Sequence, residues 1–236
     1  MPSSLLYTDQ QLLLALNGSD STWLDNVMLT ITSTTTWIPL ILVLLYVLFK
    51  NRHWREVLLF IVCLALVILI TDRFSSGFCK PFFHRLRPSH EPALEGLVDL
   101  VGDRRGGLYG FISSHAANTF GAWMFISLYF RRRSVTWTVL LWACLSSYSR
   151  IYLGLHYPGD IFCGALWGVF TGGIVYLLLI FLHRHFFSSS SIPPSVAAGF
   201  VSDASSTEVS RSFKNLLLIP ASFAITLLFV ALSAFL

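Results

Sequence analysis

The chain alternates between long apolar segments and short polar connections, and this pattern is typical of a membrane protein. A helix needs about 20 mainly apolar residues to cross a bilayer. Six segments reach or approach that length, namely 27–49, 57–78, 111–130, 134–148 with an extension as far as 155, 161–182 and 215–236. The pattern predicts an all-α integral membrane protein, built as a bundle of about six transmembrane helices.

Two segments, near the N-terminus and before the last apolar segment, do not fit the pattern of spanning helices. Residues 4–17 are apolar but too short to span, which suits a helix lying in the membrane interface. Residues 188–210 are rich in serine and contain a proline pair, so we expect a flexible cytoplasmic linker over 186–213. A final transmembrane helix over 214–236 completes a single membrane domain over 1–236.

Composition supports the membrane class and excludes a soluble one. The chain is 55% hydrophobic and 12% charged, with a mean hydropathy of +0.68. Soluble domains carry about 25% charged residues. The basic residues are dispersed among the polar connections and form no single patch. We therefore expect a lipid bilayer as partner and no nucleic acid.

Charge also predicts the orientation in the membrane. The connections at 50–56, 131–133 and 183–214 together hold nine lysines and arginines against three acidic residues. The remaining segments hold seven against nine. Cytoplasmic loops carry the excess of positive residues. The N-terminus and the loops at 72–110 and 149–160 are thus predicted to lie outside the cytoplasm.

Three polar clusters occur on this predicted external side. Because antiparallel helices return these segments to the same membrane face, the clusters can converge. They comprise Lys80, Arg87 and Pro88 in KPFFHRLRP, Ser113, Ser114 and His115 in GFISSH, and Ser149, Arg150, His156 and Asp160 in SRIYLGLHYPGD.

The cations and hydroxyls of these clusters suit a phosphate group. Lys80, Arg87 and Arg150 bring positive charge, and an arginine fork matches phosphate oxygens in a bidentate manner. Ser113 and the backbone amides of a helix N-terminus add neutral donors to an anion. No acidic cluster of the kind that Mg²⁺ requires accompanies them. We therefore expect metal-free chemistry without a cofactor.

The two histidines and the aspartate suit phosphoryl transfer through a covalent intermediate. That reaction needs one group to attack phosphorus and another to protonate the departing oxygen and then activate water. An aspartate beside the nucleophilic imidazole fixes its tautomer and stabilises the cation formed. His156 and Asp160 are four residues apart around a Pro-Gly pair, so they can face each other across a helix start or tight turn.

The order and spacing of the clusters resemble the three-part signature of the type 2 phosphatidic acid phosphatase family, whose superfamily includes vanadium-dependent haloperoxidases. The resemblance covers about residues 24–185, which would form the phosphatase core. By position it implies that His156 is the nucleophile, Asp160 its orienting carboxylate and His115 the general acid and base. The phosphate-binding residues implied are Lys80, Arg87, Ser113, Ser114 through its amide, and Arg150.

One position departs from the family pattern. The usual Pro-Ser-Gly-His is replaced here by Ile112, Ser113, Ser114 and His115. A serine still supplies the backbone N–H, so the change concerns how closely a substrate approaches this turn.

The resemblance implies a lipid phosphate phosphatase at the periplasmic face of a bacterial inner membrane. The N-terminal layout and the first two clusters are similar to phosphatases of the Bacteroidetes lineage, some acting on the lipid A 4′-phosphate and others on undecaprenyl diphosphate. The polar loop at 84–107 favours the sugar headgroup of lipid A. Undecaprenyl diphosphate and phosphatidylglycerophosphate remain alternatives. A non-catalytic lipid-binding or transport protein would have lost a motif residue, and a haloperoxidase would require peroxide.

Other residues near the clusters receive simpler interpretations. Gly164, Gly168 and Gly172 recur every four residues and predict close helix packing. The glycines at 106, 107 and 110 are interpreted as a hinge before the third long helix, with a phosphate cradle as the alternative. Arg85 is interpreted as a solvated or headgroup-contacting neighbour of the first cluster.

Overall fold

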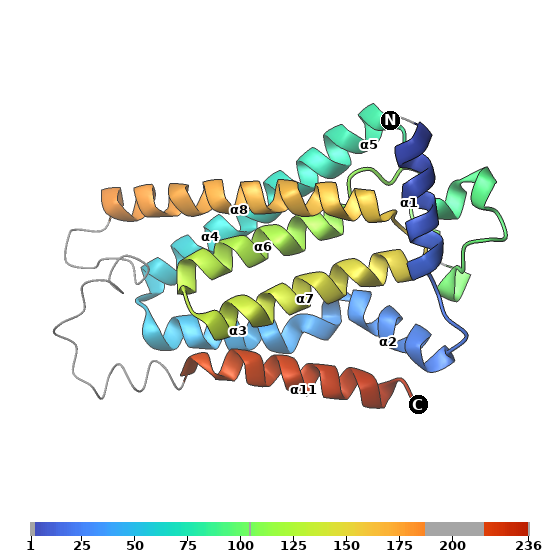
Figure 1. Cartoon of the computed structure of the whole chain (residues 1–236). Coiled ribbons are helices and arrows are strands. Elements are labelled where there is room, and N and C mark those ends of the chain that lie inside the picture. The colour runs from blue at the N-terminus through green and yellow to red at the C-terminus, as the bar shows by residue number, and fades with distance from the viewer. Residues whose placement is uncertain (1–2, 104, 187–214, 236) are drawn as a thin grey trace.

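The computed structural model describes residues 3–103, 105–186 and 215–235, and the described chain is built of helices. The long helices run side by side as a bundle, and the first helix, α1 (Ser3–Leu16), lies across one end of it (Figure 1). The prediction of an all-α membrane bundle with an additional N-terminal helix is confirmed, whereas the number of six transmembrane helices stays a prediction. The predicted linker at 186–213 lies almost entirely outside the described residues.

The prediction of one continuous helix over 27–49 is wrong, because the helix is interrupted at Ser33. α2 (Thr22–Thr32) ends there, and a 3₁₀ turn, η1 (Thr34–Trp37), leads into α3 (Ile38–Asn51). The Thr36 hydroxyl donates to the Thr30 carbonyl at 2.6 Å. Threonine and serine side chains compete in this way with the helical backbone, so an uncharged sequence need not form one helix.

The second long helical segment extends beyond its predicted end. α4 (Trp54–Asp72), the π-helical segment η2 (Arg73–Cys79) and α5 (Lys80–Phe83) follow one another without a break, and together they form a helix of 30 residues. This extension places Lys80 in the last turn of a long rigid element.

The remaining long helices are α6 (Ser114–Phe130), α7 (Arg133–Tyr152), α8 (Pro158–Phe186) and α11 (Leu218–Ser233). By length and composition, three described segments can cross a membrane, and α11 is a shorter apolar helix. The three are Thr34–Asn51, Trp54–Phe83 and Pro158–Phe186.

α6 and α8 pack backbone against backbone through the predicted glycine face. A Cβ atom added at Gly168 would lie 2.3 Å from the Ala117 carbonyl oxygen. One added at Gly164 would lie 2.5 Å from the carbonyl oxygen of Ser113, the residue before α6, and one added at Gly172 would lie 2.4 Å from the Gly121 carbonyl oxygen. Only glycine allows so close an approach, and the predicted packing face is confirmed. This contact fixes the start of α8 against the start of α6.

Candidate active site

The helix order brings the three polar clusters to one end of the bundle, the end that α1 crosses (Figure 1). Lys80 comes from the last turn of the 30-residue helix, and Ser113 precedes α6. Arg150 lies in the last turn of α7, and Asp160 lies in the first turn of α8. The expected convergence is therefore observed.

His156 and Asp160 form a buried pair. The His156 Nδ1 atom lies 3.4 Å from the Asp160 Oδ2 atom, and the two residues are 2% and 0% exposed. The same Oδ2 atom accepts the Tyr157 N–H at 3.2 Å, and the Asp160 carbonyl accepts the Ser113 N–H at 3.0 Å. Pro158 begins α8, so the pair spans the step from the preceding loop into the first helical turn.

Arg87 determines the tautomer of His156. Its Nη1 atom lies 3.2 Å from the His156 Nε2 atom and donates to the Leu155 carbonyl, while its Nε atom donates to the Tyr109 carbonyl. A guanidinium group can only donate hydrogen bonds. Nε2 is therefore the acceptor, and the ring proton of the neutral imidazole is on Nδ1, facing Asp160. The lone pair of Nε2 therefore points at Arg87, on the side where a phosphate bound by Arg87 would lie.

The charges around His156 keep its imidazole neutral. Burial lowers the pKa of His156 well below its ordinary value of 6.5, and nearby positive charges lower it further. Those charges belong to Arg87, Arg150, Lys80 and His115. A neutral imidazole at neutral pH is the form in which histidine acts as a nucleophile.

Lys80 and the start of α6 form the second side of the site. The Lys80 Nζ atom donates to the Ser114 hydroxyl at 2.8 Å and to the Ser76 hydroxyl at 3.2 Å. Ser113 is fully buried and caps α6, its hydroxyl accepting the Ala116 N–H at 3.4 Å. The first amides of a helix, here including that of Ser114, have no partner within the helix and attract anions.

Thr32 at the end of α2 is a site residue that the sequence did not reveal. Its hydroxyl accepts a hydrogen bond from Arg150 Nη1 at 2.8 Å, and its backbone interacts with the half-buried His115 ring. The break at Ser33 ends α2 beside the site, so the overturned prediction of one long helix also concealed this contact.

The glycine loop lies against the reactive pair. Arg87 N–H donates to the Leu108 carbonyl, and Gly110 N–H donates to the Arg85 carbonyl, at 3.0 and 2.9 Å. A Cβ atom added at Gly110 would lie 3.1 Å from Asp160 Oδ2 and 3.6 Å from His156 Nδ1. The loop is therefore paired with the segment that carries Arg87, and the interpretation of its glycines as a hinge stays a prediction.

The structure corrects the interpretation of Arg85 as a solvated residue. Its side chain is only 11% exposed, and its Nη1 atom contacts Asp160 Oδ1 at 2.7 Å. It is thus a buried neighbour of the reactive pair and not a solvated residue. Within the described residues, no group of three or more histidine, cysteine, aspartate or glutamate side chains could hold a metal ion.

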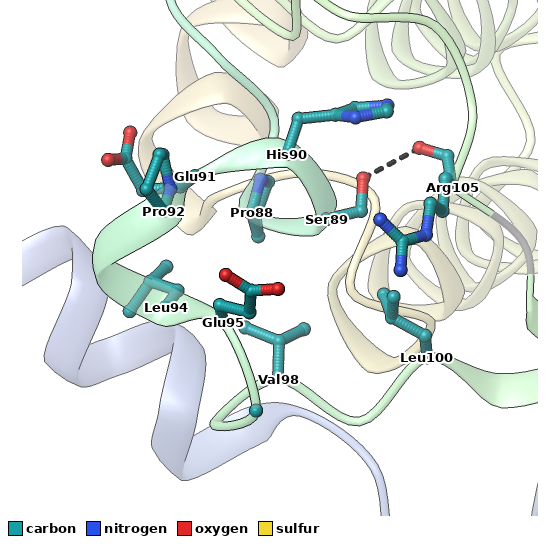
Figure 2. Close-up of a pocket in the computed structure, with 11 residues that line it drawn as sticks. Pro88, Ser89, His90, Glu91, Pro92, Leu94, Glu95, Val98, Leu100 and Arg105 are labelled. Carbon is teal, nitrogen blue, oxygen red and sulfur yellow. Dashed lines mark hydrogen bonds between the residues drawn. The ribbon is translucent and has the colours of Figure 1, made fainter.

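A separate cavity of about 210 Å³ begins one residue beyond Arg87 (Figure 2). Pro88, Ser89 and His90 form one wall, and the hydroxyl of Ser89 donates to the Arg105 carbonyl at 2.6 Å. Glu95 and Arg105 bring opposite charges to the same cavity, and Figure 2 shows both side chains beside it. The cavity thus offers hydrogen-bonding groups in the segment that directly follows Arg87.

Comparison with known proteins identifies a family and close relatives. A profile described as the PAP2 superfamily matches residues 56–184, more than half of the chain. The chain is 42% identical over 186 residues to the lipid A 4′-phosphatase of Bacteroides thetaiotaomicron, covering 78% of this chain and 83% of that protein. It is 36% identical over 197 residues to the lipid A 4′-phosphatase of Porphyromonas gingivalis, covering 83% and 84%.

A solved structure shares the fold. It is the first transmembrane PAP2-type phosphatidylglycerolphosphate phosphatase from Bacillus subtilis, with a TM-score of 0.56 and 19% identity. The similarity covers 79% of this chain and 90% of that one.

Proposed function

The chain belongs to the PAP2 superfamily and is a membrane lipid phosphatase, and we propose that it hydrolyses the 4′-phosphate of lipid A through a phosphohistidine intermediate. The observation that carries the mechanism is the arrangement of His156 between Asp160 on Nδ1 and Arg87 on Nε2. One nitrogen is held by a carboxylate, and the other faces a phosphate-binding cation.

In the first step, His156 Nε2 attacks phosphorus. The new P–N bond forms as the bond from phosphorus to the sugar oxygen breaks, and His115 gives a proton to that departing oxygen. Asp160 stabilises the positive charge that develops on the imidazole. Lys80, Arg87 and Arg150 bind the phosphoryl oxygens, with Arg87 turning from Nε2 to the phosphate.

In the second step, His115 takes a proton from water as the water oxygen attacks phosphorus. The P–N bond breaks, inorganic phosphate forms, His156 returns to its neutral state, and His115 returns to the protonated state from which it gave its proton. The side-chain cations neutralise the phosphate throughout, so we propose that the reaction is independent of metal. Ser113 and the Ser114 amide complete the set of donors at the N-terminus of α6.

One feature supports a sugar headgroup on the substrate, and a second supports a substrate that is embedded in the membrane. The cavity that follows Arg87 in the chain is lined by Ser89, His90 and Glu95, and we propose that these polar residues hold the sugar ring that carries the phosphate. On the outer surface, Phe78, Phe82 and Phe83 are all about half exposed or more and flank Lys80 in the chain. An apolar surface beside a phosphate site suits a substrate that arrives within the membrane.

The charge difference between the two sides of the membrane supports a periplasmic active site. The connections at 50–56 and 131–133 lie at the bundle end opposite to the site (Figure 1). Because these connections carry many of the basic residues, the positive-inside rule assigns their end to the cytoplasm of a bacterial inner membrane.

The direct test compares three substrates on the purified protein in detergent with EDTA and without peroxide. We expect phosphate release from bisphosphorylated lipid A with a higher kcat/KM than from undecaprenyl diphosphate or phosphatidylglycerophosphate, and loss of the 4′-phosphate by mass spectrometry. Preference for either other lipid would overturn the substrate. An acid-labile phosphate label on wild type that is absent from His156→Ala would support the intermediate, and its persistence in the variant would refute it.

A further inference from the structure

We propose that Arg85 and Asp9 are positioning residues for the His156–Asp160 pair, which makes the N-terminal helix α1 a functional part of the active site. This inference rests on the proposed function, because it assigns these residues to the same phosphoryl transfer. Asp9 lies outside the 56–184 region that matches the family profile.

Arg85 joins two carboxylates with the two arms of one guanidinium group. Its Nη1 atom donates to Asp160 Oδ1 at 2.7 Å, and its Nη2 atom donates to Asp9 Oδ2 at 2.6 Å. The Asp160 side chain is 0% exposed and that of Asp9 is 13% exposed. A charge-assisted fork of this kind fixes direction as well as distance.

The orientation of Asp160 follows from this contact. With Oδ1 bound to Arg85, the carboxylate presents Oδ2 to His156 Nδ1 and to the Tyr157 N–H. Rotation of the carboxylate would break the hydrogen bond to Arg85. Arg85 thus acts on His156 through Asp160, without contact with the reacting phosphate.

Asp9 also binds the backbone at the start of α8, the helix that carries Asp160. Its Oδ1 atom accepts the Gly159 N–H at 2.7 Å, in the first turn of α8. A Cβ atom added at Gly159 would lie 2.7 Å from Asp9 Oδ2, so a side chain there would displace this carboxylate. Asp9 therefore binds the backbone immediately before Asp160 as well as the arginine that orients Asp160.

The Arg85 guanidinium is also held by an aromatic ring. Its Cζ atom lies 4.1 Å from the centre of the Tyr157 ring, within the range of a cation–π contact. Two carboxylates and one ring therefore restrict the same group, which leaves it little freedom to leave Asp160.

α1 itself is fixed to the bundle and does not merely lie on a surface. Leu13 is fully buried against Ile151 and Tyr157. At the end of the helix, the Asn17 amide donates to the Tyr152 carbonyl at 2.7 Å, and its carbonyl oxygen accepts the Asp99 N–H at 2.7 Å. These contacts hold Asp9 at a constant place relative to α8.

The experiment measures kcat and KM for Arg85→Gln, Arg85→Lys and Asp9→Asn. We expect kcat to fall by about 10- to 100-fold in Arg85→Gln. This is the loss typical of removing a hydrogen-bond partner that orients a metal ligand, and Arg85 orients Asp160 in the same way. Lysine should restore part of the loss by keeping the charge. KM and inhibition by inorganic phosphate should stay near the wild-type values, because neither residue binds the phosphate.

Two matched controls make the same chemical changes elsewhere. Arg52→Gln removes the partner of Glu56 in an ion pair at the opposite end of the bundle, and Asp20→Asn changes an exposed carboxylate. Both should keep the wild-type kcat. Thermal unfolding of every variant is measured in the same detergent, and Asp9→Asn provides the second probe if Arg85→Gln is poorly folded.

Three results would overturn the inference. Wild-type kcat in folded Arg85→Gln and Asp9→Asn would show that orientation of Asp160 does not depend on them. A raised KM and weaker phosphate inhibition at unchanged kcat would make Arg85 a phosphate ligand instead. Equal losses in Arg52→Gln and Asp20→Asn would indicate a nonspecific charge effect. The ratio of each variant's kcat and KM to the wild-type value is measured with an aryl phosphate as well as with lipids. An error in the proposed lipid A substrate is thereby distinguished from an error in the roles of Arg85 and Asp9.

Discussion

The imidazole of His156 is held between two groups of opposite charge, and the contact with Asp160 defines its orientation. Nδ1 faces the Asp160 Oδ2 atom at 3.4 Å, and the pair is almost completely buried. In a buried site without competing water, a carboxylate at this distance stabilises the imidazolium that forms when Nε2 attacks phosphorus.

Replacing Asp160 by Asn should reduce kcat by roughly a hundredfold or more, because an amide does not stabilise the imidazolium formed in the first step. His156→Ala should abolish turnover. Phosphate release from lipid and aryl phosphates measures both effects. The control is His185→Ala, an exposed histidine at the other end of α8. Wild-type turnover by His156→Ala would refute its role as nucleophile.

The site could be predicted from the sequence where its residues lie in short, ordered clusters. Lys80, Arg87, His115 and His156 converge because antiparallel helices bring the end of one helix and the start of the next to the same face. The Asp9–Arg85 contact could not be predicted, since the residues are 76 positions apart and neither belongs to a periodic pattern. The break at Ser33 was missed because hydropathy is insensitive to side-chain competition for backbone hydrogen bonds.

The pH dependence of kcat/KM should report the environment of His156. Burial and the Arg87 charge lower the pKa of this imidazole, so the neutral nucleophile persists below pH 6.5. On the acid side, activity should be lost as pH falls through the pKa of Asp160, which burial raises to about 6, and then through the lowered pKa of His156. A profile from about pH 5 to 8 measures the acid limb.

Arg87→Gln provides the internal test of that profile. It removes one positive charge beside His156, so the pKa rises and the acid limb moves to higher pH. KM should increase as well, because a phosphate ligand is lost. An acid limb at or above pH 6.5 in the wild type would contradict the assignment of the titrating group.

His115→Ala should distinguish good from poor leaving groups. A sugar or alkyl oxygen needs a proton as it departs, whereas an activated aryl oxygen does not. We expect a loss of about 10²- to 10⁴-fold with the lipid and a smaller loss with the aryl phosphate when the first step is rate-limiting. Equal losses on both substrates in single-turnover measurements would argue against the acid role.

Gly110→Ala should lower kcat in a folded protein. The added Cβ would lie 3.1 Å from Asp160 Oδ2 and 3.2 Å from Arg87 Cγ, so the loop or the reactive pair must shift. Overpacking typically costs about 1–3 kcal/mol. If this strain displaces the His156–Asp160 pair, kcat should fall by about tenfold or more. Gly107→Ala is the matched control, since its Cβ meets nothing within 4 Å. Similar kcat values for the two variants would exclude this close packing.

Gly168→Ala should destabilise the bundle and disturb the site indirectly. The new Cβ would approach the Ala117 carbonyl oxygen to 2.3 Å and the Gly121 nitrogen to 2.8 Å, so α6 and α8 must separate. Overpacking typically costs about 1–3 kcal/mol, which lowers the unfolding temperature in detergent. Gly173→Ala is the control, because nothing lies within 4 Å of its Cβ. Since the Ser113 N–H binds the Asp160 carbonyl across this interface, kcat should fall with stability in Gly168→Ala. Unchanged unfolding temperature in both variants would contradict the close contact of the two helices.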